Sequence, residues 1–294
     1  MAKFVINEEF LQQVETLQIL IKNNIAGLFG GNHRTRNFGS SCEFADYRDY
    51  IAGDDITKID WNAFARFEKL YLKLFLDERQ MHTRIYIDAS RSMDYGKGRK
   101  AEQALRIAAL IAYVSVCDMD KVSVYAIHGG TVEEVFVGVH GKDMYLEQIG
   151  KLNDIVFDGD SRISEALLPA SVGYGDGLSV IISDFLTDDN YEDAIDYLCS
   201  KRRDVFCVQV LTRDELNPKI RGKAHLFDSE NIKKTYRRNI DKQIIEAYRK
   251  AVEYVTSRIR NYCEARGANY LLASADLSVG EIFLGKLSDM GVVK

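Results

Sequence analysis

A carboxylate and two hydroxyls stand at alternate positions directly after an apolar segment of the chain. Asp88, Ser90 and Ser92 follow residues 84–88, whose composition indicates a buried strand. At this spacing the three side chains can point into one turn, and the small Ala89 between them suits a tight loop. Carboxylate and hydroxyl oxygens are hard ligands that suit Mg²⁺ or Mn²⁺ and are poor ligands for zinc or copper. The segment is therefore a candidate site for a divalent cation.

Two further oxygen-bearing residues occupy similar places in the chain. Asp184 follows an apolar segment at 178–183, and Ser161 lies in a loop that leads into a predicted helix. In α/β proteins, ligands bind where the carboxyl ends of parallel strands meet, so we expect these residues to join the site. For each loop taken singly, capping of the next helix is the alternative role of such a residue. The predicted metal ligands are Asp88, Ser90, Ser92, Ser161 and Asp184.

The pattern of the remaining chain predicts the sheet that positions these residues. Short apolar segments alternate with amphipathic ones, which is typical of a parallel sheet covered on both faces. The predicted strands are 71–75, 84–88, 122–127, 131–139, 178–183, 205–211 and 269–273. The predicted helices are one that Asn7 caps, 99–117, 143–152, 161–170, 189–201, 241–266 and one that Ser278 and Glu281 cap. We therefore predict a doubly wound α/β fold with a mostly parallel sheet and helices on both faces.

Composition argues against several classes of function. The formal net charge is −5, whereas nucleic-acid binding needs a concentrated basic surface. The densest basic run, residues 233–238, is interpreted as a solvated helix start or loop. No apolar run approaches the roughly 20 residues that a membrane span needs. The N-terminus lacks the apolar core of a signal peptide, and the five cysteines show no metal-ligand spacing, so reduced thiols and a cytoplasmic location are expected.

The five residues from Asp88 to Ser92 resemble the Asp-x-Ser-x-Ser motif of the metal-ion-dependent adhesion site in von Willebrand factor type A domains. In that family a Thr from a second loop and an Asp from a third complete the site. Ser161 and Asp184 match these two positions in the same order along the chain. The resemblance implies a type A-like domain in which the three serines ligate the metal directly. It implies further that the two aspartates bind it directly or through water.

Two positions differ from the pattern of that family. Ser161 replaces Thr, which keeps the hydroxyl but loosens the side-chain rotamer. Arg162 stands where the family often has Asp or Asn. We expect its guanidinium either to compete with the cation or to pair with Asp158 or Asp160.

A second resemblance covers residues 40–80. Its residues are Phe44, Arg48, Tyr50, Gly53-Asp54-Asp55, Ile59-Asp60-Trp61, Ala65-Arg66 and Glu78-Arg79. They are similar to the signature of a bacterial domain family of unknown function, family 58, whose members carry this segment ahead of a type A-like domain. The resemblance implies an N-terminal helix and signature segment at 1–80 and a type A-like domain at 81–294. Members often occur beside MoxR-type AAA+ ATPases, which implies such an ATPase as a candidate partner.

Within the signature segment, carboxylates and arginines surround aromatic residues. We interpret this pattern as a structural ion-pair network that clamps the segment to the sheet, because Arg is suited to bidentate pairing with carboxylates. A binding or catalytic role is the alternative. Trp61 is the only tryptophan, and we predict that it fills a core; anchoring of a partner is the alternative role.

The chemistry of these residues favours a non-enzymatic protein-binding module. Three neutral hydroxyls and one or two carboxylates underfill the octahedral shell of Mg²⁺, so water or a carboxylate from a protein partner takes the open position. The alternative is a Mg²⁺-dependent hydrolase or phosphatase-like enzyme with a strand-end carboxylate as nucleophile. A dehalogenase-like enzyme would need an acid two residues after Asp88, where Ser90 is a poor proton donor. The sequence also lacks a P-loop, a Gly-x-Ser-x-Gly elbow and a zinc spacing of histidines.

Overall fold

The computed structural model describes most of the chain and divides it into two compact units. The described residues are 5–22, 44–75, 81–94, 99–170, 172–175, 177–187, 189–220, 222–227 and 235–283. Residues 30–80 form the smaller unit, and residues 1–29 with 81–294 form the larger one. Each unit is described by itself below.

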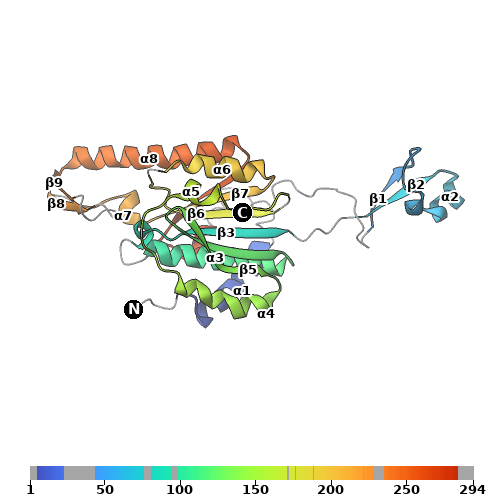
Figure 1. The fold of residues 1–294 in the computed structure, drawn as a ribbon, viewed down its shortest axis with the longest axis horizontal. Helices are drawn as coiled ribbons and strands as arrows, with labels where there is room; N and C mark the ends of the chain where they lie inside the picture. The colour runs from blue at the N-terminus through green and yellow to red at the C-terminus, as the bar shows by residue number, and fades with distance from the viewer. Residues whose placement is uncertain are drawn as a thin grey trace. The chain divides into compact units, whose positions relative to one another are not determined.

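A six-stranded sheet forms the centre of the larger unit (Figure 1). Its strand order is β10-β7-β6-β3-β4-β5. Its strands are β3 (His82–Asp88), β4 (Lys121–His128), β5 (Thr131–Val139), β6 (Leu178–Ser183), β7 (Asp204–Leu211) and β10 (Asn269–Ser274). All neighbouring strands run parallel except β4 and β5, which are antiparallel. The predicted mostly parallel sheet is therefore confirmed.

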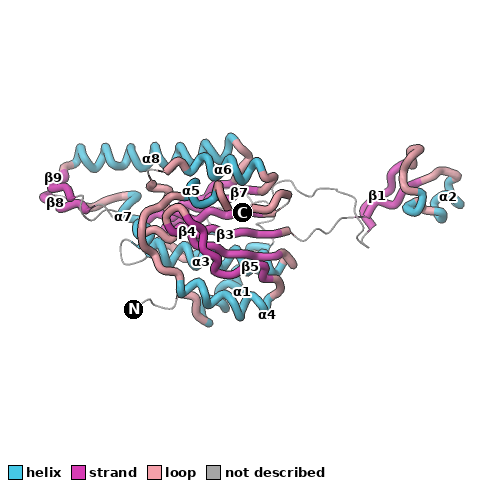
Figure 2. The backbone as a smooth tube through the Cα atoms, viewed as in Figure 1, coloured by secondary structure: helices cyan, strands magenta, loops and turns pink. Residues whose placement is uncertain are grey.

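Helices cover both faces of this sheet. They are α1 (Glu8–Lys22), α3 (Arg99–Cys117), α4 (Lys142–Gln148), α5 (Ile163–Leu167), α6 (Tyr191–Ser200), α7 (Arg213–Leu216) and α8 (Lys242–Ala265), with the 3-10 helices η3 (Arg91–Asp94) and η4 (Ile149–Asp154). In Figure 1 and Figure 2, α6 and α8 lie on one side of the sheet, and α1, α3 and α4 lie on the other. This arrangement confirms the predicted doubly wound α/β architecture. Within the described residues, each helix is too short or too polar to cross a lipid bilayer.

The hydrophobic core consists of two layers that the sheet separates. Ile85 and Ile87 of β3 pack in the layer that includes α3, whereas Tyr86 between them packs in the layer that includes α6 and part of α8. This alternation follows from the pleat, which points successive side chains to opposite faces. All six residues of β6 are buried, as expected for a central strand that is covered on both sides.

The N-terminal helix α1 belongs to the larger unit. Asn7 caps it, because its Oδ1 accepts a hydrogen bond of 2.9 Å from the backbone N–H of Phe10. Phe10 and Val14 are buried in the same core layer as α3. Residues 1–29 belong to the larger unit, and the smaller unit ends at Gln80.

A two-stranded antiparallel ribbon replaces the solvated helix start or loop predicted for residues 233–238. It pairs β8 (Gly222–Phe227) with β9 (Thr235–Ile240), so part of the basic run lies in a strand. The prediction was wrong because cross-strand pairing, which no local pattern reports, determines this segment.

The smaller unit consists of β1 (Phe44–Asp49), η2 (Ile56–Lys58), α2 (Trp61–Phe67) and β2 (Tyr71–Phe75). The two strands pair antiparallel. Asp60 organises the unit, because its Oδ1 accepts hydrogen bonds from two backbone N–H groups at the start of α2. Its Oδ2 accepts a hydrogen bond of 2.7 Å from Tyr47 Oη and lies 3.3 Å from Lys73 Nζ. These contacts hold the pKa of Asp60 at about 2, chiefly through the Tyr47 hydroxyl.

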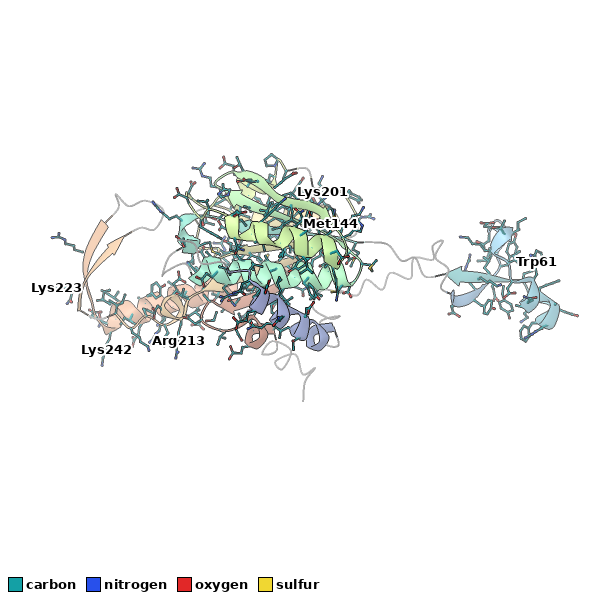
Figure 3. The ribbon with its side chains drawn as sticks, turned by 90° about the horizontal axis from the view of Figure 1, so that it is seen from below. Trp61, Met144, Lys201, Arg213, Lys223 and Lys242 are labelled. Carbon is teal, nitrogen blue, oxygen red and sulfur yellow. The ribbon has the colours of Figure 1, made fainter. Side chains whose placement is uncertain are left out.

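The smaller unit contains ion pairs, but its tryptophan lies outside any core. Arg48 pairs with Asp54 at 2.8 Å, which agrees with the predicted pairing of arginines and carboxylates. Trp61 lies at the start of α2 (Figure 3). It is 62% exposed and meets Phe64 edge to face. The prediction that Trp61 fills a core was therefore wrong, because a unit of this size has too few layers to enclose it. Glu78 and Arg79 lie outside the described residues.

Candidate metal centre

The candidate centre lies at the carboxyl edge of the sheet, beside the central strand β3. β3 has β4 on one side and β6 on the other, so the chain leaves β3 at the switch in strand order. Asp88 is the last residue of β3, and Asp184 directly follows β6. Ser161 forms an isolated parallel bridge with Gly129, which directly follows β4. The fold thus brings three distant loops to the edge where α/β proteins bind ligands.

Backbone hydrogen bonds join these loops directly. Ala89 N–H donates to the carbonyl of Ile127 at 2.9 Å, which ties the turn after β3 to β4. Arg91 N–H donates to Gly159 O at 3.0 Å, and Asp158 N–H donates to Ala89 O at 2.8 Å. The loop that carries Ser161 is therefore fixed to the turn that carries the Asp-x-Ser-x-Ser motif.

The carboxylate of Asp88 is the hub of the centre. Its Oδ2 accepts hydrogen bonds from Ser161 Oγ at 2.7 Å and from Ser183 Oγ at 2.6 Å. Its Oδ1 accepts a bond of 3.0 Å from the backbone N–H of Ser90. The hydroxyls of Ser90 and Ser92 lie 3.1 Å apart. The structure therefore brings four of the five predicted residues into one network.

Asp184 lies beside this network but has a different partner. Its Oδ2 accepts a bond of 2.8 Å from Lys100 Nζ, and its Oδ1 accepts one of 3.0 Å from Leu186 N–H. It is close enough for its charge to act on Asp88. Lys100 also donates to Glu215 Oε1 at 2.7 Å, which makes a buried ion pair with two carboxylates. Sequence reasoning missed Lys100, because a lysine in the first turn of a helix gives no sign of the carboxylates it meets.

The electrostatic environment of Asp88 is unusual for a carboxylate. The residue is 0% exposed, and burial followed by the charge of Asp184 raises its pKa above the ordinary value. Hydrogen bonds from Ser183, Ser161 and Ser90 act in the opposite direction. Among the residues that the structure describes, no basic side chain forms an ion pair with Asp88. A buried carboxylate without a counter-ion is a group that a cation would stabilise.

The donor set fits a hard divalent cation. Ser90, Ser92 and Ser161 contribute hydroxyl oxygens, and Asp88 and Asp184 contribute carboxylates, which are the ligand types that Mg²⁺ and Mn²⁺ prefer. The described part of the chain contains no group of three or more His, Cys, Asp or Glu side chains placed to hold a metal. Cation binding at this centre would therefore depend on the serine hydroxyls as well as on the carboxylates.

Three side chains that the sequence did not single out position these groups. Ser183, the last residue of β6, bonds to Asp88 and accepts from the backbone N–H of Phe185 at 2.9 Å. Thr187 Oγ1 donates to the carbonyl of Ser161 at 2.6 Å. Asp189 Oδ2 accepts from the backbone N–H of Ser164 at 2.7 Å. Hydroxyls at the end of β6 and in the following loop were the available signal.

Two arginines lie at the exposed rim of the centre. Arg162 bonds through Nε to Asp160 at 2.7 Å and through Nη1 to Glu165 at 3.1 Å. Arg91 lies 3.6 Å from a carboxylate oxygen of Asp158. Of the two roles expected for Arg162, pairing with Asp160 is the one that the structure shows.

A family comparison agrees with the second resemblance in the sequence. The model of a family described as "Protein of unknown function DUF58" matches residues 46–258, which include most of the signature segment and most of the sheet. The chain belongs to the DUF58 family. Uncharacterized proteins of Mycobacterium bovis and Mycobacterium tuberculosis are 25% identical to this DUF58 protein over 225 residues. The match covers 74% of this chain and 70% of each of those proteins.

Solved structures with similar chains include bacterial and type A domains. The conserved hypothetical protein BatB from Bacteroides thetaiotaomicron has 15% sequence identity and a TM-score of 0.41, over 72% of this DUF58 protein and 100% of that chain. The SpRpn10 VWA domain has 8% identity and a TM-score of 0.39, over 71% of this chain and 95% of that one. The assignment to the α/β class rests on the strand order and the helical layers of the DUF58 protein itself.

Proposed function

We propose that this DUF58 protein is a non-enzymatic, cytoplasmic module that binds a protein partner in a metal-dependent way. The observation that carries the proposal is the fully buried carboxylate of Asp88, which faces serine hydroxyls and a second carboxylate. The proposed metal is Mg²⁺ or Mn²⁺, and Asp88, Ser90, Ser92, Ser161 and Asp184 would hold it.

The bound metal would supply positive charge and an open coordination position for a carboxylate of the partner. The residues of the chain provide the rest. The backbone bonds that join the loops fix the spacing of the oxygens, so little ordering is needed when a ligand binds. Arg91 and Arg162 at the rim already pair with carboxylates of the chain itself, so their charges are compensated. A partner that presents Asp or Glu therefore matches the proposed metal at the centre rather than the rim.

A MoxR-type AAA+ ATPase is the proposed partner, with this protein acting as its adaptor or co-chaperone. Membership of DUF58 supports this choice, because the resemblance of residues 40–80 to that family implies such a neighbour. An enzymatic role has less support, because the side chain two residues after Asp88 is the buried hydroxyl of Ser90 rather than an acid.

The test is a pull-down of a purified MoxR-type ATPase from the same organism, with the DUF58 protein immobilised. We expect capture in Mg²⁺ or Mn²⁺, and at least a tenfold loss in EDTA. The double substitution Ser90→Ala and Ser92→Ala should reproduce the effect of EDTA. Ser123→Ala is the matched control, because this buried serine of β4 bonds to His82 and lies outside the centre. Equal capture with and without EDTA would remove the metal from the mechanism, and no capture in any condition would remove this partner.

A further inference from the structure

Lys100 is one of the most deeply buried charged side chains in the described part of the chain, with 1% of its surface exposed. It lies in the first turn of α3 and places its ammonium between two carboxylates. Nζ donates to Asp184 Oδ2 at 2.8 Å and to Glu215 Oε1 at 2.7 Å. Lysine is almost never buried to this extent unless it is paired, so these two contacts determine where the charge lies.

Glu215 is itself held firmly, which fixes the ammonium further. Its Oε2 accepts from the backbone N–H of Thr212 at 2.7 Å, and its own N–H donates to Thr212 Oγ1 at 3.2 Å. This capping box begins α7, directly after β7. One carboxylate oxygen thus completes the cap, and the other faces Lys100. The ammonium of Lys100 is thus held between the end of β6 and the start of α7.

The position of Lys100 affects how strongly the centre attracts a second cation. Lys100 already contributes one positive charge to Asp184, whereas Asp88 has no such partner among the described residues. A metal ion that uses Asp184 must therefore share this carboxylate with a fixed ammonium and must approach that like charge. In a buried site, such repulsion is screened only weakly.

We propose that Lys100 sets the cation affinity of the centre by acting as a built-in competitor for Asp184. The proposal rests on the proposed metal-dependent function. Lys100 lowers the affinity for the divalent cation. Glu215 reduces this effect, because its carboxylate compensates part of the positive charge of the ammonium. The two residues therefore have opposite effects on metal binding, although they form one ion pair.

Calorimetric titration of the purified protein with Mn²⁺ alone tests this pair of opposite effects. Lys100→Met keeps the length of the side chain and removes its charge, so we expect Mn²⁺ to bind about tenfold more tightly, as removal of a nearby like charge implies. Glu215→Gln leaves the ammonium to Asp184 alone, so we expect Mn²⁺ to bind several-fold more weakly. The double variant Lys100→Met with Glu215→Gln leaves no unpaired glutamate and should bind Mn²⁺ more tightly than Glu215→Gln does.

Circular dichroism of each metal-free variant shows whether it is folded, and the double variant serves if Lys100→Met alone does not fold. A residue with a merely structural role would lower the melting temperature in both single variants and leave Mn²⁺ affinity unchanged. The role of Lys100 is overturned if folded Lys100→Met binds Mn²⁺ no more tightly than the wild type, or if the double variant binds it no more tightly than Glu215→Gln. Binding by the wild type upholds the metal centre in either case. If neither the wild type nor any variant binds Mn²⁺, the proposed function itself fails.

Discussion

Substitution of Asp88 by Asn tests the candidate centre most directly, because the amide keeps the shape of the carboxylate and removes its charge. Two effects oppose each other in the metal-free protein. The three donors to Asp88 lose a charged acceptor, and a bond to a charged group contributes about 1 kcal/mol more than a neutral one. This loss is opposed by a gain, because the substitution removes a carboxylate whose ionised form is disfavoured by burial and by the charge of Asp184. We therefore expect a folded metal-free variant whose melting temperature differs from that of the wild type by only a few degrees.

The sign of the electrostatic effect follows from the direction of the shift in pKa. The pKa of Asp88 is higher in the folded protein than in the unfolded chain, so the folded state binds the proton more tightly. Its ionised form therefore lowers the free energy of unfolding at neutral pH, and this penalty disappears as the pH falls below the folded pKa. The amide of the Asp88→Asn variant carries no such penalty at any pH, so the substitution should raise metal-free stability more at pH 7 than at low pH.

The response to metal differs far more between the two proteins. At a free metal concentration one hundred times the Kd, linkage stabilises the folded wild type by about 2.7 kcal/mol. At roughly 2–4 °C per kcal/mol for a domain of this size, the melting temperature should rise by roughly 5–11 °C. The Asp88→Asn variant should show no rise, because it lacks the central carboxylate.

Differential scanning calorimetry in EDTA, Mg²⁺ and Mn²⁺ measures these shifts. Asp120→Asn is the matched control, because Asp120 is a partly buried carboxylate at the opposite edge of the sheet. Burial raises the pKa of Asp120 to about 6, yet its partner is the backbone N–H of Met81. This control should keep the full response to metal. A metal-induced shift that survives in Asp88→Asn, or an Asp88→Asn protein that is unfolded without metal, would refute the reasoning.

Three other substitutions test the centre and the fold around it. Ser161→Ala removes a predicted ligand and should weaken Mn²⁺ binding at least about tenfold in a calorimetric titration. Burial lowers the pKa of His82 to about 4, so as the pH falls the imidazole is protonated in the unfolded chain before it is protonated in the folded protein. The free energy of unfolding therefore decreases between about pH 6.5 and pH 4. Urea unfolding at pH 7 and pH 5 should show a smaller decrease for His82→Gln than for the wild type. Arg203→Met leaves Ser179 Oγ and the carbonyl of Leu178 without their donor, and should lower the free energy of unfolding by about 2–4 kcal/mol in urea.

The parts of the fold that the sequence predicted are those in which one local pattern determines the outcome. β6 is buried on both faces, so its apolar run has no competing interpretation, and its observed bounds equal the predicted ones. The helix at 99–117 was predicted at its observed bounds as well, because its apolar residues recur with the helical period over a long segment. Asp88 and Asp184 were found for the same reason, since each lies at the end of such a strand or directly after it.

The parts that the sequence did not predict depend on contacts between distant residues. Lys100 meets Asp184 and Glu215 across 84 and 115 positions of the chain, and a lysine is normally interpreted as solvated. The ribbon of β8 and β9 has no apolar alternation and exists through pairing of its two strands. Trp61 was assigned to a core on residue type alone, although the size of the surrounding unit decides whether a core can enclose it.

The exposed position of Trp61 determines which optical signals report on which unit. The chain has a single tryptophan and sixteen tyrosines, so excitation at wavelengths that tyrosine does not absorb addresses only the smaller unit. Emission from an indole that already faces water should change little in wavelength when that unit unfolds. Tyrosine emission or circular dichroism, and not the emission wavelength of this indole, is therefore the signal with which to follow the six-stranded sheet.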